Sequence, residues 1–170
     1  MKLRFSLAFL CFGLFSSAAF ADRFQLEYDV KKQDYYVVRV KTIGGAIRYS
    51  KNYQNVDEAK AVMNTLRNTQ FSYVRIGWDG AGYYVAKKRF LAKDERVTET
   101  FESVDVAAAS TKLIAANWNS HYSIKYDSEC KKYYIVRCHH AFCHKHPFSD
   151  PFDTLEAAIE ELKKLVEAKG

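Results

Sequence analysis

Residues 73–89, YVRIGWDGAGYYVAKKR, decide the fold. An alternating segment from Tyr73 to Trp78 leads into a turn at residues 79–82, and a second strand begins at Tyr83. Alternating segments on both sides of an Asp/Gly turn are typical of a β-hairpin. The stretch therefore predicts two antiparallel strands joined by a tight turn.

The double tyrosine of this hairpin occurs in two further places. Tyr35-Tyr36-Val37 lies 48 residues before Tyr83-Tyr84-Val85, and Tyr133-Tyr134-Ile135 lies 50 residues after it. Each copy follows its own alternating segment and turn. A third strand is expected in the first two copies, at residues 46–50 and 96–101. In the third copy, residues 139–147 occupy this place; we expect a Cys/His-rich loop at residues 138–146, and a third strand there is left open.

A helix is expected to close each copy. Asn55, Ser103 and Thr154 are residue types that prefer the N-cap position, because their side-chain oxygens accept hydrogen bonds from free backbone N–H groups. After each cap, residues recur with spacings of 3, 4 and 3 and therefore share one helical face. The three stripes are Val56, Ala59, Met63 and Leu66; Val104, Ala107, Thr111 and Ile114; and Leu155, Ala158, Leu162 and Leu165.

These elements predict an α+β fold of three tandem ββ(β)α repeats, in which a helix covers one face of each antiparallel sheet. Repeat 1 spans residues 22–70, repeat 2 residues 71–119 and repeat 3 residues 120–170. A unit of this size has only a small hydrophobic core when it is alone. No linker rich in Gly, Ser or Pro separates the repeats, so we expect them to pack against one another.

Residues 1–21, MKLRFSLAFLCFGLFSSAAFA, have the order of a secretory signal peptide. Lys2 and Arg4 precede an apolar segment that is short for a membrane span, and a small-x-small cleavage motif ends at Ala21. Cleavage there leaves 149 residues with 24 basic and 20 acidic side chains, a net charge of +4 and no transmembrane segment. An uncleaved membrane anchor is the alternative. We expect a secreted or periplasmic protein of bacterial type, in a compartment that permits disulfides.

Repeat 3 concentrates cysteine and histidine between residues 138 and 146. Thiolates and neutral imidazoles are the ligands that zinc and copper ions prefer. The candidate metal ligands are Cys138, His140, Cys143, His144 and His146. Three cysteines remain after cleavage, so Cys138 can instead form a disulfide with Cys143, or Cys130 with one of them. A solvated histidine-rich loop is the third interpretation.

Basic and aromatic residues alternate on the strands that begin with the double tyrosine. In an extended strand Tyr35, Val37 and Arg39 share one face, while residues 36, 38 and 40 share the other. We predict that the first face is exposed and that the helix covers the second. The predicted partner-binding residues are Tyr35, Arg39, Tyr83, Lys87, Tyr133 and Arg137. The alternative is that these basic residues only keep the strand edges soluble.

A cationic, aromatic sheet surface suits an acidic protein patch, an anionic glycan or a lipid head group. Export and a net charge of only +4 weigh against nucleic acid. The sequence contains no G-x-S-x-G, no H-E-x-x-H and no glycine-rich phosphate loop. We therefore expect an exported, non-catalytic binding protein. The alternative is a zinc- or copper-binding protein centred on residues 138–146, and a small hydrolase at that site ranks third.

Overall fold

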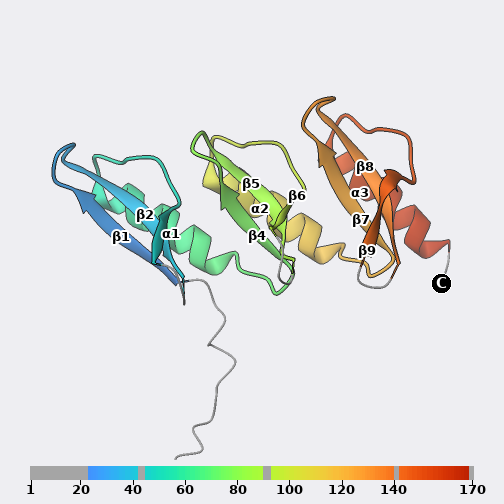
Figure 1. Ribbon diagram of the computed structural model, residues 1–170, viewed down its shortest axis with the longest axis horizontal. Helices are drawn as coiled ribbons and strands as arrows, with labels where there is room; N and C mark the ends of the chain where they lie inside the picture. Colours follow the sequence, from blue (N-terminus) through green and yellow to red (C-terminus); the bar gives the residue numbers. More distant parts are fainter. Residues whose placement is uncertain (1–22, 42–44, 90–92, 140–141, 169–170) are drawn as a thin grey trace, which may run out of the picture.

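The computed structural model describes residues 23–41, 45–89, 93–139 and 142–168, and the predicted signal peptide lies outside these ranges. The fold is a mixed α+β arrangement of three antiparallel sheets, each followed by a helix, as predicted (Figure 1). The three units form a row, and their sheets are tilted in the same direction. None of the helices in the described ranges has the length and apolarity needed to cross a bilayer.

Each sheet is a three-stranded meander whose central strand carries the double tyrosine. The elements of repeat 1 are β1 (Arg23–Asp29), β2 (Asp34–Val40), β3 (Ala46–Arg48) and α1 (Val56–Asn68). Those of repeat 2 are β4 (Val74–Trp78), β5 (Tyr83–Lys87), β6 (Glu95–Arg96) and α2 (Val104–Ala116). Those of repeat 3 are β7 (Tyr122–Asp127), β8 (Lys132–His139), β9 (Phe142–Pro147) and α3 (Leu155–Glu167).

An aspartate begins each of the three hairpin turns. Asp79 Oδ1 accepts hydrogen bonds from the backbone N–H groups of Ala81 and Gly82, both at 3.0 Å. Asp29 and Asp127 accept equivalent bonds in repeats 1 and 3. Because the aspartate side chain supplies the acceptor, the chain reverses direction at the same place in every repeat.

A hydroxyl side chain completes each sheet where the third strand ends. Thr98 Oγ1 accepts the N–H of Val85 at 2.9 Å and donates to the Glu99 carbonyl at 3.0 Å. Ser50 and Ser149 accept the N–H groups of residues 37 and 135 in the same way, at 2.8 and 3.0 Å. The hydroxyl thus replaces a backbone acceptor that the short third strand cannot supply. The sequence reasoning did not predict this shared feature.

The three predicted helix caps are confirmed. Asn55 Oδ1 accepts from the N–H of Asp57 at 2.7 Å, and Ser103 Oγ accepts from the N–H of Asp105 at 3.2 Å. Thr154 Oγ1 accepts from the N–H of Ala157, one position further into its helix than in the other two repeats, at 3.2 Å. Two residues before each cap, an aromatic residue pairs with the first tyrosine of the central strand through two backbone hydrogen bonds. The start of each helix is therefore fixed to its own sheet.

The helix covers the sheet face opposite to the predicted one. In repeat 1, Val37 is fully buried and belongs to the same core as Leu66 of α1. Tyr36 lies on the other side of β2, on the face that turns away from the helix. Repeats 2 and 3 follow the same rule, with Val85 and Ile135 in the core. We call the helix-covered side the inner face, and the side that carries the second tyrosine of each pair the outer face.

The repeats are packed together through two hydrophobic cores that cross the repeat boundaries. One core joins Phe24, Val37, Tyr49 and Leu66 of repeat 1 to Ile76, Tyr83, Val104, Ala107 and Ala108 of repeat 2. The second joins Val74, Val85, Val97 and Ile114 of repeat 2 to Tyr122, Ile124, Tyr133, Ile135, Leu155, Ala158, Ile159 and Leu162 of repeat 3. Burial of this apolar surface stabilises each unit by contact with its neighbour.

Candidate functional site

Two of the predicted partner-binding tyrosines lie in the protein core. Tyr83 is 1% exposed and Tyr133 is 2% exposed, so the expectation that they form an exposed surface is wrong. The hydroxyl of Tyr83 lies 3.1 Å from that of Tyr53 in the preceding repeat. Burial raises the pKa of Tyr83, and burial also raises the pKa of Tyr133 to about 12. These side chains join neighbouring repeats and are not available to a partner.

The basic members of the predicted surface lie toward the other end of the central strands. Arg39 and Lys87 are half-buried and lie near aromatic rings, whereas Arg137 is exposed. The ammonium group of Lys87 is 5.3 Å from the centre of the Trp118 ring, and burial lowers the pKa of Lys87. The six predicted residues therefore do not form one continuous exposed surface, because Tyr83 and Tyr133 pack inward and Tyr35 is half-buried.

The outer face carries a different combination of tyrosine and arginine. In repeat 1, the guanidinium carbon of Arg48 lies 4.6 Å from the centre of the Tyr36 ring. The Tyr36 hydroxyl donates a 2.7 Å hydrogen bond to Glu27 Oε2, and this bond, together with burial, raises the pKa of Tyr36. Arg48 Nε donates to the Ser50 carbonyl at 2.8 Å. The cation thus has a defined position above the ring.

Repeat 2 contains the same arrangement at equivalent positions. The guanidinium carbon of Arg96 lies 4.6 Å from the centre of the Tyr84 ring, and Arg96 Nε donates to the Thr98 carbonyl at 2.7 Å. Gly77 faces Tyr84 across the β4–β5 pairing. A Cβ atom at position 77 would collide with the tyrosine ring, so glycine allows the ring to lie close to the strand. We call Tyr36–Arg48 and Tyr84–Arg96 the Tyr–Arg pairs.

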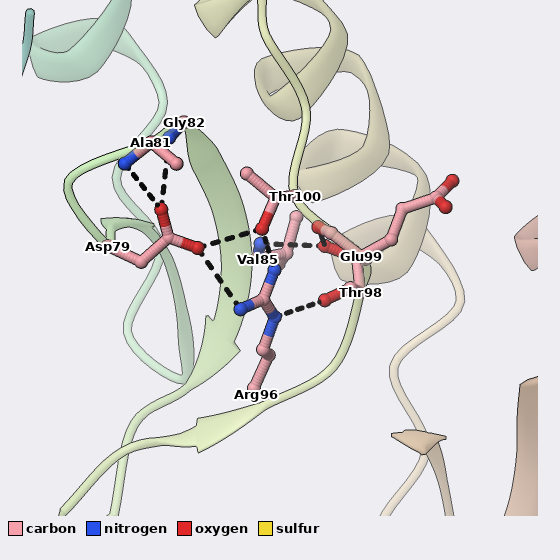
Figure 2. Close-up of polar contacts among 8 residues, drawn as sticks. All are labelled: Asp79, Ala81, Gly82, Val85, Arg96, Thr98, Glu99 and Thr100. Carbon is pink, nitrogen blue, oxygen red and sulfur yellow. Dashed lines mark hydrogen bonds and ion pairs between the residues drawn. The ribbon is translucent and has the colours of Figure 1, made fainter. Parts of the chain in front are cut away.

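A polar network anchors the second Tyr–Arg pair (Figure 2). Asp79 Oδ2 accepts from Arg96 Nη1 at 3.2 Å and from the Thr100 hydroxyl at 2.8 Å, and Arg96 Nη2 also donates to that hydroxyl. Burial alone would raise the pKa of Asp79. The N–H groups of Gly82 and Ala81, the Thr100 hydroxyl and the Arg96 guanidinium outweigh burial, so the pKa of Asp79 is lowered. The carboxylate therefore stays ionised at neutral pH and holds both the turn and the arginine.

Repeat 3 lacks the arginine of the Tyr–Arg pairs. Pro147 faces Val136 in the β8–β9 pairing, where Arg48 faces Val38 and Arg96 faces Ala86 in the other repeats. Tyr134 keeps the place of the tyrosine, and Lys125 on β7 lies opposite to it. The cationic, aromatic character of the outer face thus continues in repeat 3 with a different geometry.

The Cys/His-rich segment is a strand pair where a loop was expected. Strand β8 continues to His139, β9 begins at Phe142, and Cys138 lies directly opposite Cys143. The prediction failed because residues 142–147 show no alternation of apolar and polar residues, which is the sequence signal of a strand. Cys138 is buried and disulfide-bonded, whereas Cys130 is exposed and free. Cys130 is therefore not a disulfide partner of this segment.

The predicted metal site falls mostly outside the described side chains. His140 lies outside the described residues, and the side chains of Cys143, His144 and His146 lie outside them as well. Among the residues that the structure does describe, no group of three or more His, Cys, Asp and Glu side chains is placed to hold a metal ion. The zinc or copper site therefore remains a prediction.

The Tyr–Arg pairs were not predicted from the sequence, although the sequence contains a signal for them. Arg48 and Arg96 each stand 12 residues after the second tyrosine of their repeat. A comparison of the repeats for shared basic positions finds this spacing in the first two copies. Comparison of the chain with protein-family models, curated protein sequences and solved structures found no match.

Proposed function

We propose that the protein is an exported, non-catalytic binding protein whose outer face recognises an acidic patch on a partner protein. The observation that carries this proposal is the presence of the Tyr–Arg pairs at equivalent positions of repeats 1 and 2. A guanidinium held over a tyrosine ring provides a cation and an apolar surface together. Tyr and Arg are also the side chains that most often contribute strongly to protein interfaces.

The arginines are held in place before a partner arrives. Each Nε atom is bonded to a backbone carbonyl of its own repeat, and each guanidinium is 4.6 Å from its ring centre. Ordering a long side chain at an interface costs about 0.5–1.5 kcal/mol, and a pre-positioned arginine avoids part of that cost. Arg48 is exposed, so its guanidinium can reach a carboxylate of the partner.

Two observations support export. Residues 1–21 have the order of a secretory signal, and the disulfide at Cys138 fits an oxidising compartment. The register that places Cys143 opposite Cys138 supports a pairing of these two residues. Opposite residues in antiparallel strands have Cα atoms about 4.5–5.5 Å apart, which lies within the range that a disulfide allows.

The test is salt elution of the purified chain from immobilised polyglutamate. An Arg48→Ala/Arg96→Ala variant is expected to elute at clearly lower salt than the unmodified chain, because charge-assisted contacts are lost. The matched control is Lys112→Ala/Lys163→Ala, which removes the same charge from exposed helix positions. Equal shifts in both variants would show that only net charge matters and would contradict the proposal. Retention on a sulfated glycan but not on polyglutamate would contradict an acidic protein partner and indicate an anionic glycan instead.

A further inference from the structure

Exposed apolar side chains gather at the two ends of the row. Tyr28 in repeat 1 is 48% exposed, and Val30 in the neighbouring turn is also exposed. At the other end, Phe148 is 47% exposed. Among the described residues, the other large apolar side chains in this class are Val106 on α2 and Val166 on α3, and Val166 lies beside residues 116–119 at the boundary with repeat 2. Exposed apolar surface that is confined to particular sites often marks an interface.

Tyr28 belongs to an aromatic pair that the other repeats bury against their preceding neighbour. The ring centres of Tyr28 and Tyr35 are 4.9 Å apart, and the equivalent pairs Trp78–Tyr83 and Tyr126–Tyr133 have separations of 4.8 and 5.0 Å. In the pairs of repeats 2 and 3, the second ring, that of Tyr83 or Tyr133, is almost fully buried. Among the residues that the structure describes, no other repeat packs against this side of repeat 1, where Tyr28 is exposed and Tyr35 is half-buried.

Phe148 occupies a position that the other repeats bury against their following neighbour. Tyr49 and Val97 are its equivalents, since each directly precedes the hydroxyl residue that completes the sheet. Tyr49 is 5% exposed and donates a 2.6 Å hydrogen bond to the Ile76 carbonyl of the next repeat. Val97 lies in the core that joins repeats 2 and 3. Within the described part of the chain, no repeat packs against this side of repeat 3, and Phe148 lines an open hollow together with Phe152 and Leu165.

We infer that these two ends are complementary halves of one interface, and that repeat 1 of a second copy of the chain docks onto repeat 3 of the first. The same interface already occurs twice within the chain, between repeats 1 and 2 and between repeats 2 and 3. Docking would continue the row shown in Figure 1 and bury Tyr28 and Tyr35 against Phe148 and Phe152. A contact between two different surfaces leaves an unused end on each copy, so further copies add head to tail.

Charges at the two ends support this pairing. Between repeats 1 and 2, Thr65 Oγ1 donates to Asp105 Oδ1 at 3.3 Å. The helices align without gaps, so the residues at these positions in the intermolecular contact are Lys164 and Asp57. Val62 and Ala108 belong to the core between repeats 1 and 2, and the equivalent positions at the two ends of the row are Glu161 and Lys60. Both pairs bring opposite charges together, which favours the correct docking over other contacts.

The test is sedimentation velocity of the whole chain, expressed with residues 1–21 so that any processing occurs, after the N-terminus of the purified protein has been determined. The weight-average mass is expected to rise between about 1 μM and about 1 mM, through dimers to longer species. Tyr28→Glu disables one end and Phe148→Glu disables the other. Each variant alone should stay monomeric at concentrations where the unmodified chain associates.

A mixture of the two variants is the decisive measurement. Each retains one intact end, so an equimolar mixture should form dimers of one copy of each and nothing larger. The control Val106→Glu, an exposed apolar position away from both ends, should associate like the unmodified chain. Lys164→Glu should weaken association at least tenfold, and Asp57→Lys in the same chain should restore it. Circular dichroism confirms that each variant is folded.

Three outcomes would overturn the inference. The first is a monomer over the whole concentration range. The second is association that neither end variant changes, which would place the contact elsewhere, including residues 1–21. The third is a mixture of the two end variants that stays monomeric.

Discussion

A Thr98→Val substitution measures what the hydroxyl at the end of the third strand contributes to the fold. Thr98 is fully buried, and its Oγ1 accepts the N–H of Val85 at 2.9 Å. The Val85 carbonyl points to the same side of β5, because it accepts from the N–H of Val97 at 2.8 Å. The Val85 N–H is therefore directed toward Thr98 and away from β4. Valine keeps the shape of threonine but removes the acceptor, which leaves a buried N–H without a partner.

The expected loss of unfolding free energy is about 2 kcal/mol, since an unsatisfied buried donor costs about 1–3 kcal/mol. Thr111→Val is the matched control, because Thr111 is also fully buried. Its Oγ1 donates at 2.7 Å to the Ala107 carbonyl, which lies within α2 and has a helical hydrogen-bond partner as well. No N–H loses an acceptor there, so the free energy of unfolding should change by less than about 0.5 kcal/mol.

Urea denaturation followed by circular dichroism gives both values, with the midpoint shifted and the slope unchanged. The reasoning would be refuted by a Thr98→Val variant that is as stable as the unmodified chain. It would also be refuted by equal losses in the two valine variants, which would show that buried threonine hydroxyls matter in general and not through the Val85 N–H.

Three further predictions follow from the same contacts. Gly77→Ala should cost about 1–3 kcal/mol of unfolding free energy, measured by urea denaturation, because the new Cβ collides with the Tyr84 ring; an unchanged midpoint would contradict that geometry. Asp79 has a lowered pKa in the folded state, so it stabilises the fold above its unfolded pKa, and this contribution disappears as the pH falls through its folded pKa. Asp79→Asn should therefore lower stability at neutral pH and match the unmodified chain in strong acid, and a constant difference across the pH range would reject the argument. Thiol titration of the purified, processed chain should detect Cys130 without reductant and two further thiols after reduction, with no stoichiometric zinc or copper by elemental analysis; one equivalent of metal with free thiols would instead support the metal-binding alternative.

The helices were predictable because their signals are local. An N-cap residue acts on backbone groups two or three residues away, and a stripe with helical spacing needs only the helix itself. Asn55, Ser103 and Thr154 accordingly cap the helices as expected. The hairpins were predictable for the same reason, since an aspartate at the turn bonds to N–H groups within the next three residues.

The orientation of the sheets was not predictable, because both faces of the central strands are buried. Val37 and Val38 are adjacent, point to opposite faces and are both buried. Val85 and Ala86 repeat the pattern. On the outer face, Arg48 lies opposite Val38 in register and extends to the Tyr36 ring, so the stem of the arginine covers apolar surface. The alternation of side chains along a strand shows which residues share a face, but it cannot show whether a helix or an arginine stem covers that face.

Burial at the repeat boundaries depends on where a repeat stands in the row, and the sequence differences between copies follow that dependence. One helix position is the exposed Lys60 in repeat 1, the buried Ala108 in repeat 2 and the buried Ile159 in repeat 3. In repeat 1, at the end of the row, Lys60 thus replaces the buried apolar residue of the other repeats, and the helix side of that end is charged and not apolar. Tyr28 nevertheless keeps its aromatic ring at the same end, on the sheet side. An apolar patch beside charged groups is the composition of a specific interface, whereas an end that only needed solubility would be polar throughout.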